Sequence, residues 1–356
     1  MNKYLFVLIA SCLFRSTFAQ DFSHEFGKIS AEELQLKRYE KDSTAEAVIL
    51  YDIGKSYFTE TSKGFDMIFE KKTRIKILTK AGLAKAEFLI SYYKEKENEE
   101  KVLEIKGNTY NLENGEIKIS ALNPSNTFNE KYNEHWYNRK IAMPDVRIGS
   151  VIEFSYKILS PYIFNLRNWE FQRKIPVIYS EYTTSMVPFY DYVCKLQGAT
   201  KCDEYINYTD KGLSHVNFGL EYHENVFTYI MKNLPAFKDE AFITSAEDNI
   251  IKLDFQLATV RQSDGTTRDI ISTWPKLAEG LLGEAKFGDY LKESKNKSKK
   301  IIETFNLTGL SKLEKAKSID RYVKNGFNWN NHKSINTTSK VSDFLINKTG
   351  NCADIN

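Results

Sequence analysis

Alternation of polar and apolar residues recurs over the first two-thirds of the chain and constrains its fold more than any other feature. Residues 73–77 and 102–110 alternate as half-buried strands do. The second run meets Asn114-Gly115 and resumes at residues 116–119, and Asn-Gly between two such runs predicts a tight β-hairpin. Further β-prone segments predict a mainly antiparallel, sandwich-like β domain over residues 21–265, and they lie at 45–57, 69–78, 151–156, 181–187, 189–196, 201–208 and 226–231.

After residue 265 the spacing of apolar residues changes from that of strands to that of helices. Residues 274–291 and 294–305 read as helices, and Ser311 with Glu314 forms a capping-box pattern ahead of an apolar stripe at helical spacing. A shorter helix is expected at 341–346. We therefore expect a helical connection over 266–295 and further helices over 296–356. The same capping pattern at residues 30–33 predicts a short helix near the N-terminus.

The first nineteen residues have the pattern of a secretory signal peptide. Lys3 gives a positive start, residues 5–14 form an apolar run, and Ala19 offers a small residue for cleavage. The run is shorter than the roughly 20 residues that span a bilayer. We expect an exported protein, periplasmic or at the cell surface, with no transmembrane segment in the mature chain. Ile9-Ala10-Ser11-Cys12 also fits a lipid-attachment pattern, which leaves anchoring through Cys12 as an alternative.

Charge and motif content exclude several classes of function. The 50 basic residues nearly balance the 47 acidic residues, and the lysine run at 292–300 has no interleaved aromatic residues, so no nucleic-acid partner is expected. Gly54-Lys55-Ser56 lacks the earlier glycine of a phosphate loop. The five histidines and the cysteines lack the spacing of metal ligands. We therefore expect neither a cofactor nor a metal ion.

Two cysteines lie symmetrically about Gly198. A hairpin turning at residues 197–199 would place Cys194 opposite Cys202, where a disulfide could form in an oxidising compartment. A different strand register would leave both as thiols. Pairing these two makes Cys352 the odd cysteine of the mature chain, and an odd cysteine is a candidate reactive thiol.

Cys352 stands in the run Gly350-Asn351-Cys352-Ala353-Asp354 and is the candidate nucleophile. It follows an amphipathic helix pattern, and we expect it in the first turn of a helix, whose free amides and dipole favour a thiolate. Gly350 would allow close approach of backbone and substrate. Asp354 either braces the helix start or is an ordinary first-turn acid. The alternative for Cys352 is a buried, unreactive cysteine.

Two groups of segments resemble a known domain pair. Residues 109–115, 143–154 and 233–240 resemble a β-rich domain of unknown function, found in secreted bacterial proteins ahead of a transglutaminase-like core. Residues 319–323, 327–330 and 348–354 resemble the start of that core. The resemblance implies that residues 296–356 are the α-helical N-terminal portion of an incomplete, transglutaminase-like α+β domain. In that family the cysteine attacks an amide or ester carbonyl, a histidine takes the thiol proton, and an aspartate orients the histidine. Cys352 matches the nucleophile, and no residue here matches the other two.

The resemblance implies the N-terminal portion of an exported transglutaminase-like cysteine peptidase or acyltransferase. Its substrates would be protein or peptide amides, and the chain as given would be inactive because the histidine and aspartate are missing. The alternative is a non-catalytic module that binds or scaffolds peptide or glycan of the cell envelope.

Overall fold

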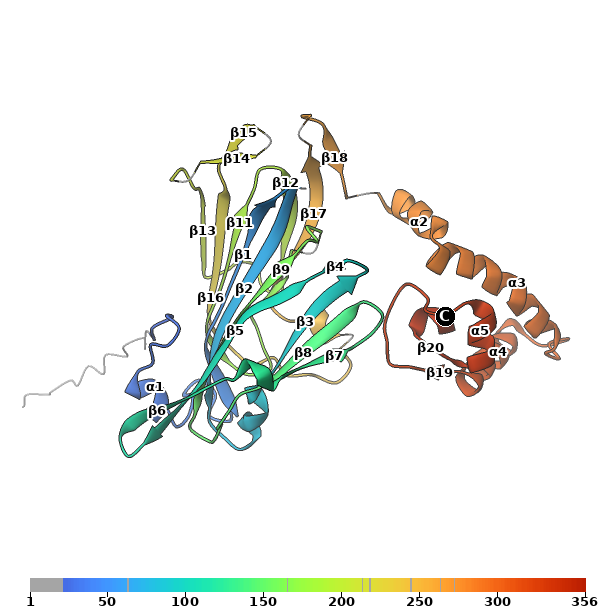
Figure 1. Ribbon diagram of the computed structural model, residues 1–356. Coiled ribbons are helices and arrows are strands. Elements are labelled where there is room, and N and C mark those ends of the chain that lie inside the picture. Colours follow the sequence, from blue (N-terminus) through green and yellow to red (C-terminus); the bar gives the residue numbers. More distant parts are fainter. Residues whose placement is uncertain are drawn as a thin grey trace, which may run out of the picture. The chain divides into compact units, whose positions relative to one another are not determined.

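The computed structural model describes residues 22–62, 64–164, 166–212, 214–217, 219–243, 245–262, 264–271 and 273–356. The expected signal peptide and Cys12 lie outside these residues. The chain forms two compact units that meet after Leu257 (Figure 1). Each unit is described by itself below.

The N-terminal unit is built on a large sheet with eight described strands. All neighbouring strands are antiparallel except β1 and β11, which run parallel. The expectation of a mainly β domain with antiparallel sheets is therefore confirmed. In spatial order the strands are β13 (Glu204–Thr209), β16 (Asn225–Leu234), β11 (Val177–Met186), β1 (Ala47–Thr61), β2 (Gly64–Ile77), β9 (Val151–Ser160), β5 (Lys101–Glu113) and β6 (Glu116–Ala121).

The hairpin between β5 and β6 has the turn that the sequence predicts. Glu113 pairs with Glu116, which leaves Asn114 and Gly115 as the two turn residues. Their φ angles of 51° and 88° both lie in the left-handed region. Asparagine and glycine are the residues that accept this conformation most readily, so the turn confirms the prediction.

Smaller sheets pack against one face of the large sheet. Phe154 on β9 stacks on Phe88 on β3 with ring centroids 4.4 Å apart, and Trp169 on β10 stacks on Tyr182 on β11 at 5.1 Å. These residues belong to the main hydrophobic core. The smaller sheets contain β3 (Glu87–Glu95), β4 (Asn98–Glu99), β7 (Thr127–Lys131) and β8 (Trp136–Ala142), then β10 (Trp169–Glu170), β12 (Tyr190–Gln197) and β17 (Lys252–Arg261), and the hairpin of β14 (His215–Asn217) and β15 (Leu220–Tyr222). β17 continues past Leu257, and the end that belongs to the C-terminal unit pairs with β18 (Thr267–Asp269).

Gly54 lies in the middle of β1 and has a packing role. A Cβ atom at this position would stand 2.3 Å from the ring of Trp169, so only glycine leaves room for the indole. Trp169 is buried and donates from Nε1 to Ser180 Oγ at 3.0 Å. The Gly54-Lys55-Ser56 run is thus part of a strand that lies against the core.

The hairpin expected between Cys194 and Cys202 is not formed, and this prediction is wrong. β12 belongs to the sheet of β10 and β17, whereas β13 pairs with β16 in the large sheet. The connecting segment is held elsewhere: Gln197 donates to Glu247 O at 2.6 Å, and Gly198 lies against the backbone of Ile250. Both cysteines are free thiols in this structure, and burial raises the pKa of Cys202 to about 11.

Short helices complete both units. A capping box between Ser30 and Glu33 starts α1 (Ala31–Gln35), and another between Ser311 and Glu314 starts α4 (Lys312–Gly326), as predicted. The other helical elements are η1 (Ala81–Ala86), η2 (Pro124–Asn126), η3 (Ala246–Asp248), α2 (Trp274–Gly283), η4 (Ala285–Asp289), α3 (Tyr290–Glu303), α5 (Val341–Asn347) and α6 (Cys352–Ile355).

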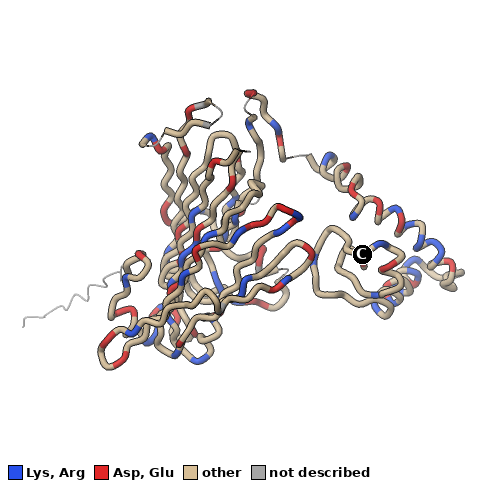
Figure 2. Tube along the Cα trace, in the orientation of Figure 1, with Lys and Arg blue, Asp and Glu red and all other residues tan. Residues whose placement is uncertain are grey.

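The C-terminal unit is mostly helical, with the two-stranded pair β19 (Asn328–Trp329) and β20 (Thr349–Gly350). Phe327 and Phe344 stack with ring centroids 4.9 Å apart and form part of its small core. Acidic residues interrupt the lysine-rich α3, as Figure 2 shows along the helix. Within the described residues, no helix has both the length and the apolar character needed to cross a membrane.

Candidate functional site

Cys352 is the first residue of α6, as the sequence predicts. The preceding helix α5 ends at Lys348, whose left-handed conformation (φ 58°) turns the chain into β20. Asn351 then caps α6: its Oδ1 accepts from the Asp354 amide at 2.9 Å, and Asp354 Oδ2 accepts from the Asn351 amide at 2.9 Å. This reciprocal capping fixes the position of Cys352 although α6 is a single turn.

Asp354 braces a neighbouring loop as well as the helix. Its carboxylate is buried and accepts from the Thr338 amide at 3.0 Å, the Thr338 hydroxyl at 2.7 Å and the Ser339 amide at 3.3 Å. Together with the Asn351 amide, these donors engage both carboxylate oxygens. Asp354 therefore acts as a structural anchor for residues 334–339.

Gly350 is required by the packing of its neighbours. A Cβ atom there would lie 2.6 Å from Asp354 Cβ and 2.9 Å from a ring carbon of Phe344. Glycine at this position thus leaves room for Asp354 to reach the loop. The sequence alone suggests a different purpose for this glycine, the close approach of a substrate.

The Cys352 thiol is half-buried and hydrogen-bonded to a single residue of that loop. Its Sγ accepts from the Ser334 amide at 3.2 Å and donates to Ser334 O at 3.1 Å. The amide would stabilise a thiolate, whereas the carbonyl can be satisfied only by the protonated thiol. A base that activates Cys352 must therefore take the proton that Ser334 O now accepts. The Cys352 amide is itself engaged, donating to His332 O at 3.3 Å.

The N-terminal unit contains a second candidate site, an open groove on the other face of the large sheet from the main core. We call it the outer-face groove. Its volume is about 600 Å³, within the range of ligand pockets. It is lined by side chains of β1, β2, β5, β9, β11, β13 and β16, and by Phe26 from the N-terminal segment.

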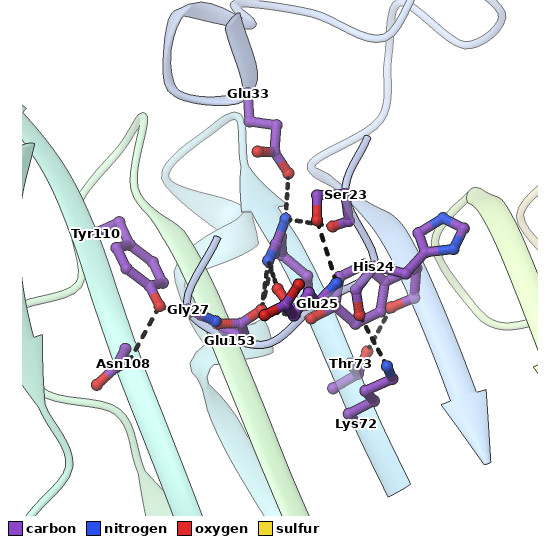
Figure 3. Close-up of polar contacts among 12 residues, drawn as sticks. Ser23, His24, Glu25, Gly27, Glu33, Lys72, Thr73, Asn108, Tyr110 and Glu153 are labelled. Atoms are coloured by element: carbon purple, nitrogen blue, oxygen red, sulfur yellow. Dashed lines mark hydrogen bonds and ion pairs between the residues drawn. The ribbon is translucent and has the colours of Figure 1, made fainter. Parts of the chain in front are cut away.

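A buried polar cluster closes one end of the same face. Arg74 on β2 donates from Nη1 to Glu33 Oε1 at 2.7 Å and from Nε to Glu153 Oε1 at 3.0 Å, and all three side chains are essentially inaccessible (Figure 3). Arg74 also donates to the carbonyls of Ser23 and Glu25 at 2.9 and 3.0 Å. The arginine therefore ties the N-terminal segment, residues 22–36, to the sheet.

Further polar contacts complete this Arg74 cluster, as Figure 3 shows. Glu153 Oε2 accepts from the Gly27 amide at 2.7 Å and from the Tyr110 hydroxyl at 2.9 Å, and Tyr51 donates to Glu153 Oε1. Burial raises the pKa of Tyr110 to about 12. Lys76 donates to Leu34 O at 2.6 Å, and burial lowers its pKa to about 8.

Sequence reasoning missed both the groove and the Arg74 cluster. One signal was available: residues 71–74 read Lys-Lys-Thr-Arg within a β-prone run. Successive side chains on a strand point to opposite faces, so this run predicts cations on both faces of the strand, with residues 72 and 74 sharing one of them. The sequence alone does not say which carboxylates would meet it. Among the described residues, no group of three or more His, Cys, Asp and Glu side chains could hold a metal ion.

Comparisons with known proteins agree with the β-rich expectation. Residues 66–211 match a family described as a domain of unknown function with solved structure (DUF3857). The fold is similar to the crystal structure of a putative protease from Parabacteroides distasonis ATCC 8503, with 13% identity and a TM-score of 0.54. That likeness covers 87% of this chain and 57% of the other, so the chain spans little more than half of that structure. No curated protein matches.

Proposed function

We propose that Cys352 is the nucleophile of an exported transglutaminase-like cysteine peptidase or acyltransferase that acts on protein or peptide amides. The observation that carries the proposal is the placement of this cysteine at the start of a helix whose cap and adjoining loop are both fixed by Asp354. The similarity to a structure described as a putative protease supports the same class of protein. The β-rich unit would then be the domain that precedes the catalytic core.

The proposed reaction begins with loss of the Cys352 proton to a base. The thiolate, retaining the hydrogen bond from the Ser334 amide, attacks the amide carbonyl carbon of the substrate. The C–N bond breaks, the proton passes to the leaving amine, and a thioester remains. Water or a second amine then resolves the thioester by hydrolysis or transfer. In the family that the sequence resembles, the base is a histidine.

Acyl transfer to hydroxylamine tests this proposal. The protein is mixed with a glutamine-containing peptide and hydroxylamine, and hydroxamate is measured. Cys352→Ala is expected to lose about a thousandfold or more of the activity, whereas Cys202→Ala retains it. Activity that survives in Cys352→Ala would refute the assignment.

A second function, binding without catalysis, is supported by a separate observation. The outer-face groove has the volume of a ligand site and is lined by both charged and apolar side chains. This supports a role of the N-terminal unit in binding an envelope peptide or glycan, whether or not Cys352 is a nucleophile.

A further inference from the structure

We propose that the outer-face groove binds a peptide whose carboxylate side chains are spaced by apolar residues. The inference deepens the second proposed function and is independent of Cys352. It rests on the arrangement of charges in the groove, on the apolar side chains beside them, and on the wall formed by the N-terminal segment.

Strand register places the groove residues side by side. Lys55 on β1 lies between Thr183 on β11 and Glu70 on β2. Lys72, two residues after Glu70 on β2, pairs with Ser155 on β9. Ser155 in turn pairs with Lys106 on β5. Neighbouring strands lie about 4.8 Å apart, so Lys72 and Lys106 flank Ser155 at about that distance, whereas Lys55 lies two strands and two residues away, at roughly 12 Å.

Only some of the lysines in the groove form ion pairs with its carboxylates. Lys157 forms ion pairs with Glu70 at 3.0 Å and with Glu104 at 3.2 Å. Across the described residues, Lys55, Lys72 and Lys106 have no carboxylate within 4.0 Å. Lys72 instead donates to His24 O at 2.8 Å. Glu70 lies opposite Lys55 on the neighbouring strand and offsets part of its charge. Lys72 and Lys106 therefore carry the positive charge beside Ser155, which favours a ligand carrying carboxylates.

The remaining lining selects among anionic ligands. Glu70, Glu104 and Glu181 line the same groove, and these carboxylates would repel a uniformly charged polymer. Ile53 and Phe26, both partly exposed, supply apolar surface, which an acidic polysaccharide would leave unused and apolar side chains would cover. A peptide in which acidic and apolar residues alternate matches both features.

The wall of the groove is fixed before any ligand arrives. Phe26 lies between Glu25, whose carbonyl accepts from Arg74, and Gly27, whose amide donates to Glu153. The Arg74 cluster thus holds Phe26 in place. Because the wall is ordered in advance, a peptide would lose less affinity to ordering of the site.

Binding of a defined peptide tests the inference. The probe is fluorescein-labelled Leu-Glu-Phe-Glu-Leu with a blocked C-terminus, titrated with the 356-residue chain and followed by fluorescence anisotropy. Lys55→Gln with Lys106→Gln removes two charges that form no ion pair within 4.0 Å among the described residues, although Lys55 lies over the Tyr57 ring, and is expected to raise the Kd about tenfold. Lys195→Gln with Lys201→Gln, two exposed lysines outside the groove, is the matched control and should bind like the unsubstituted chain. Circular dichroism checks that each variant is folded.

Three further outcomes decide the inference. The same peptide with glutamine in place of glutamate should bind at least tenfold more weakly, and 0.5 M salt should weaken binding of the acidic peptide. Cys352→Ala should bind normally, which separates this result from any failure of the enzymatic proposal. The inference is overturned if the acidic peptide does not bind at millimolar concentration, if the groove variant binds as well as the control, or if trigalacturonic acid binds more tightly than the peptide with the same lysine dependence.

Discussion

Replacing Arg74 by methionine should remove a large share of the stability of the N-terminal unit. The substitution keeps much of the apolar stem but leaves Glu33 without its ionic partner, with only the Ser30 amide at 2.6 Å still donating to it. Glu153 loses two donors and keeps Tyr51, Tyr110 and Gly27. Breaking a buried ion pair on one side costs about 3–5 kcal/mol. Total stabilities are about 5–15 kcal/mol, so the effect should be obvious.

Urea unfolding at pH 7 measures this loss, and hydrogen exchange of the Gly27 amide reports whether the N-terminal segment opens first. Lys85→Met is the matched control, because the ion pair of Lys85 with Glu46 at 2.8 Å has both side chains about one-third exposed. Losing such a pair costs about 1 kcal/mol or less.

Neutralising the two carboxylates tests whether uncompensated charge causes the loss of stability in Arg74→Met. Adding Glu33→Gln and Glu153→Gln to Arg74→Met removes the uncompensated carboxylates and should recover part of the lost stability. The reasoning fails if Arg74→Met is no more destabilising than Lys85→Met, or if the triple variant is less stable than the single one.

Three other predictions follow from separate features. Gly54→Ala should destabilise the fold by about 1–3 kcal/mol in urea unfolding, because the new methyl group would overlap the Trp169 ring; an unchanged midpoint would contradict this. Burial lowers the pKa of Lys76 to about 8, so between about pH 8 and 10 the unfolded chain binds more protons than the folded protein. The free energy of unfolding should therefore rise across that window by up to about 1.4 kcal/mol per pH unit, and by less in Lys76→Met. Asp354→Asn should loosen the loop that Asp354 anchors, and native iodoacetamide labelling of Cys352 should then be faster; unchanged labelling would show that the loop does not limit access.

Local features of the fold could be predicted from sequence because their causes lie within a few residues. The turn at Asn114-Gly115 depends on two residues that tolerate positive φ, and the caps at Ser30 and Ser311 depend on an acid three residues later. The position of Cys352 at a helix start is of the same kind. Whether Cys352 is a nucleophile depends on a base. Its Sγ hydrogen-bonds to the amide and the carbonyl of Ser334, and neither backbone group can act as that base.

Partner choice between distant segments could not be predicted in the same way. The symmetry of Cys194 and Cys202 about Gly198 suggested a hairpin, but β13 pairs with β16, where Tyr205 and Tyr229 pack with ring centroids 5.2 Å apart. The Arg74 cluster likewise joins β2 to residues before and after it in the chain. A single sequence shows that charges are present without showing which of them meet.

The parallel pairing of β1 with β11 has a consequence for the order in which the chain can fold. The hairpin of β1 and β2 needs only a short turn, whereas Ile49 meets Val177 more than a hundred residues later. Closing so long a loop is slow, and a chain made from its N-terminus must wait for β11. Meanwhile one edge of β1, rich in apolar residues, has unpaired amides and carbonyls and can pair with other chains. Refolding yield should therefore fall with protein concentration, and the interval before β11 docks is when this protein is most vulnerable to aggregation.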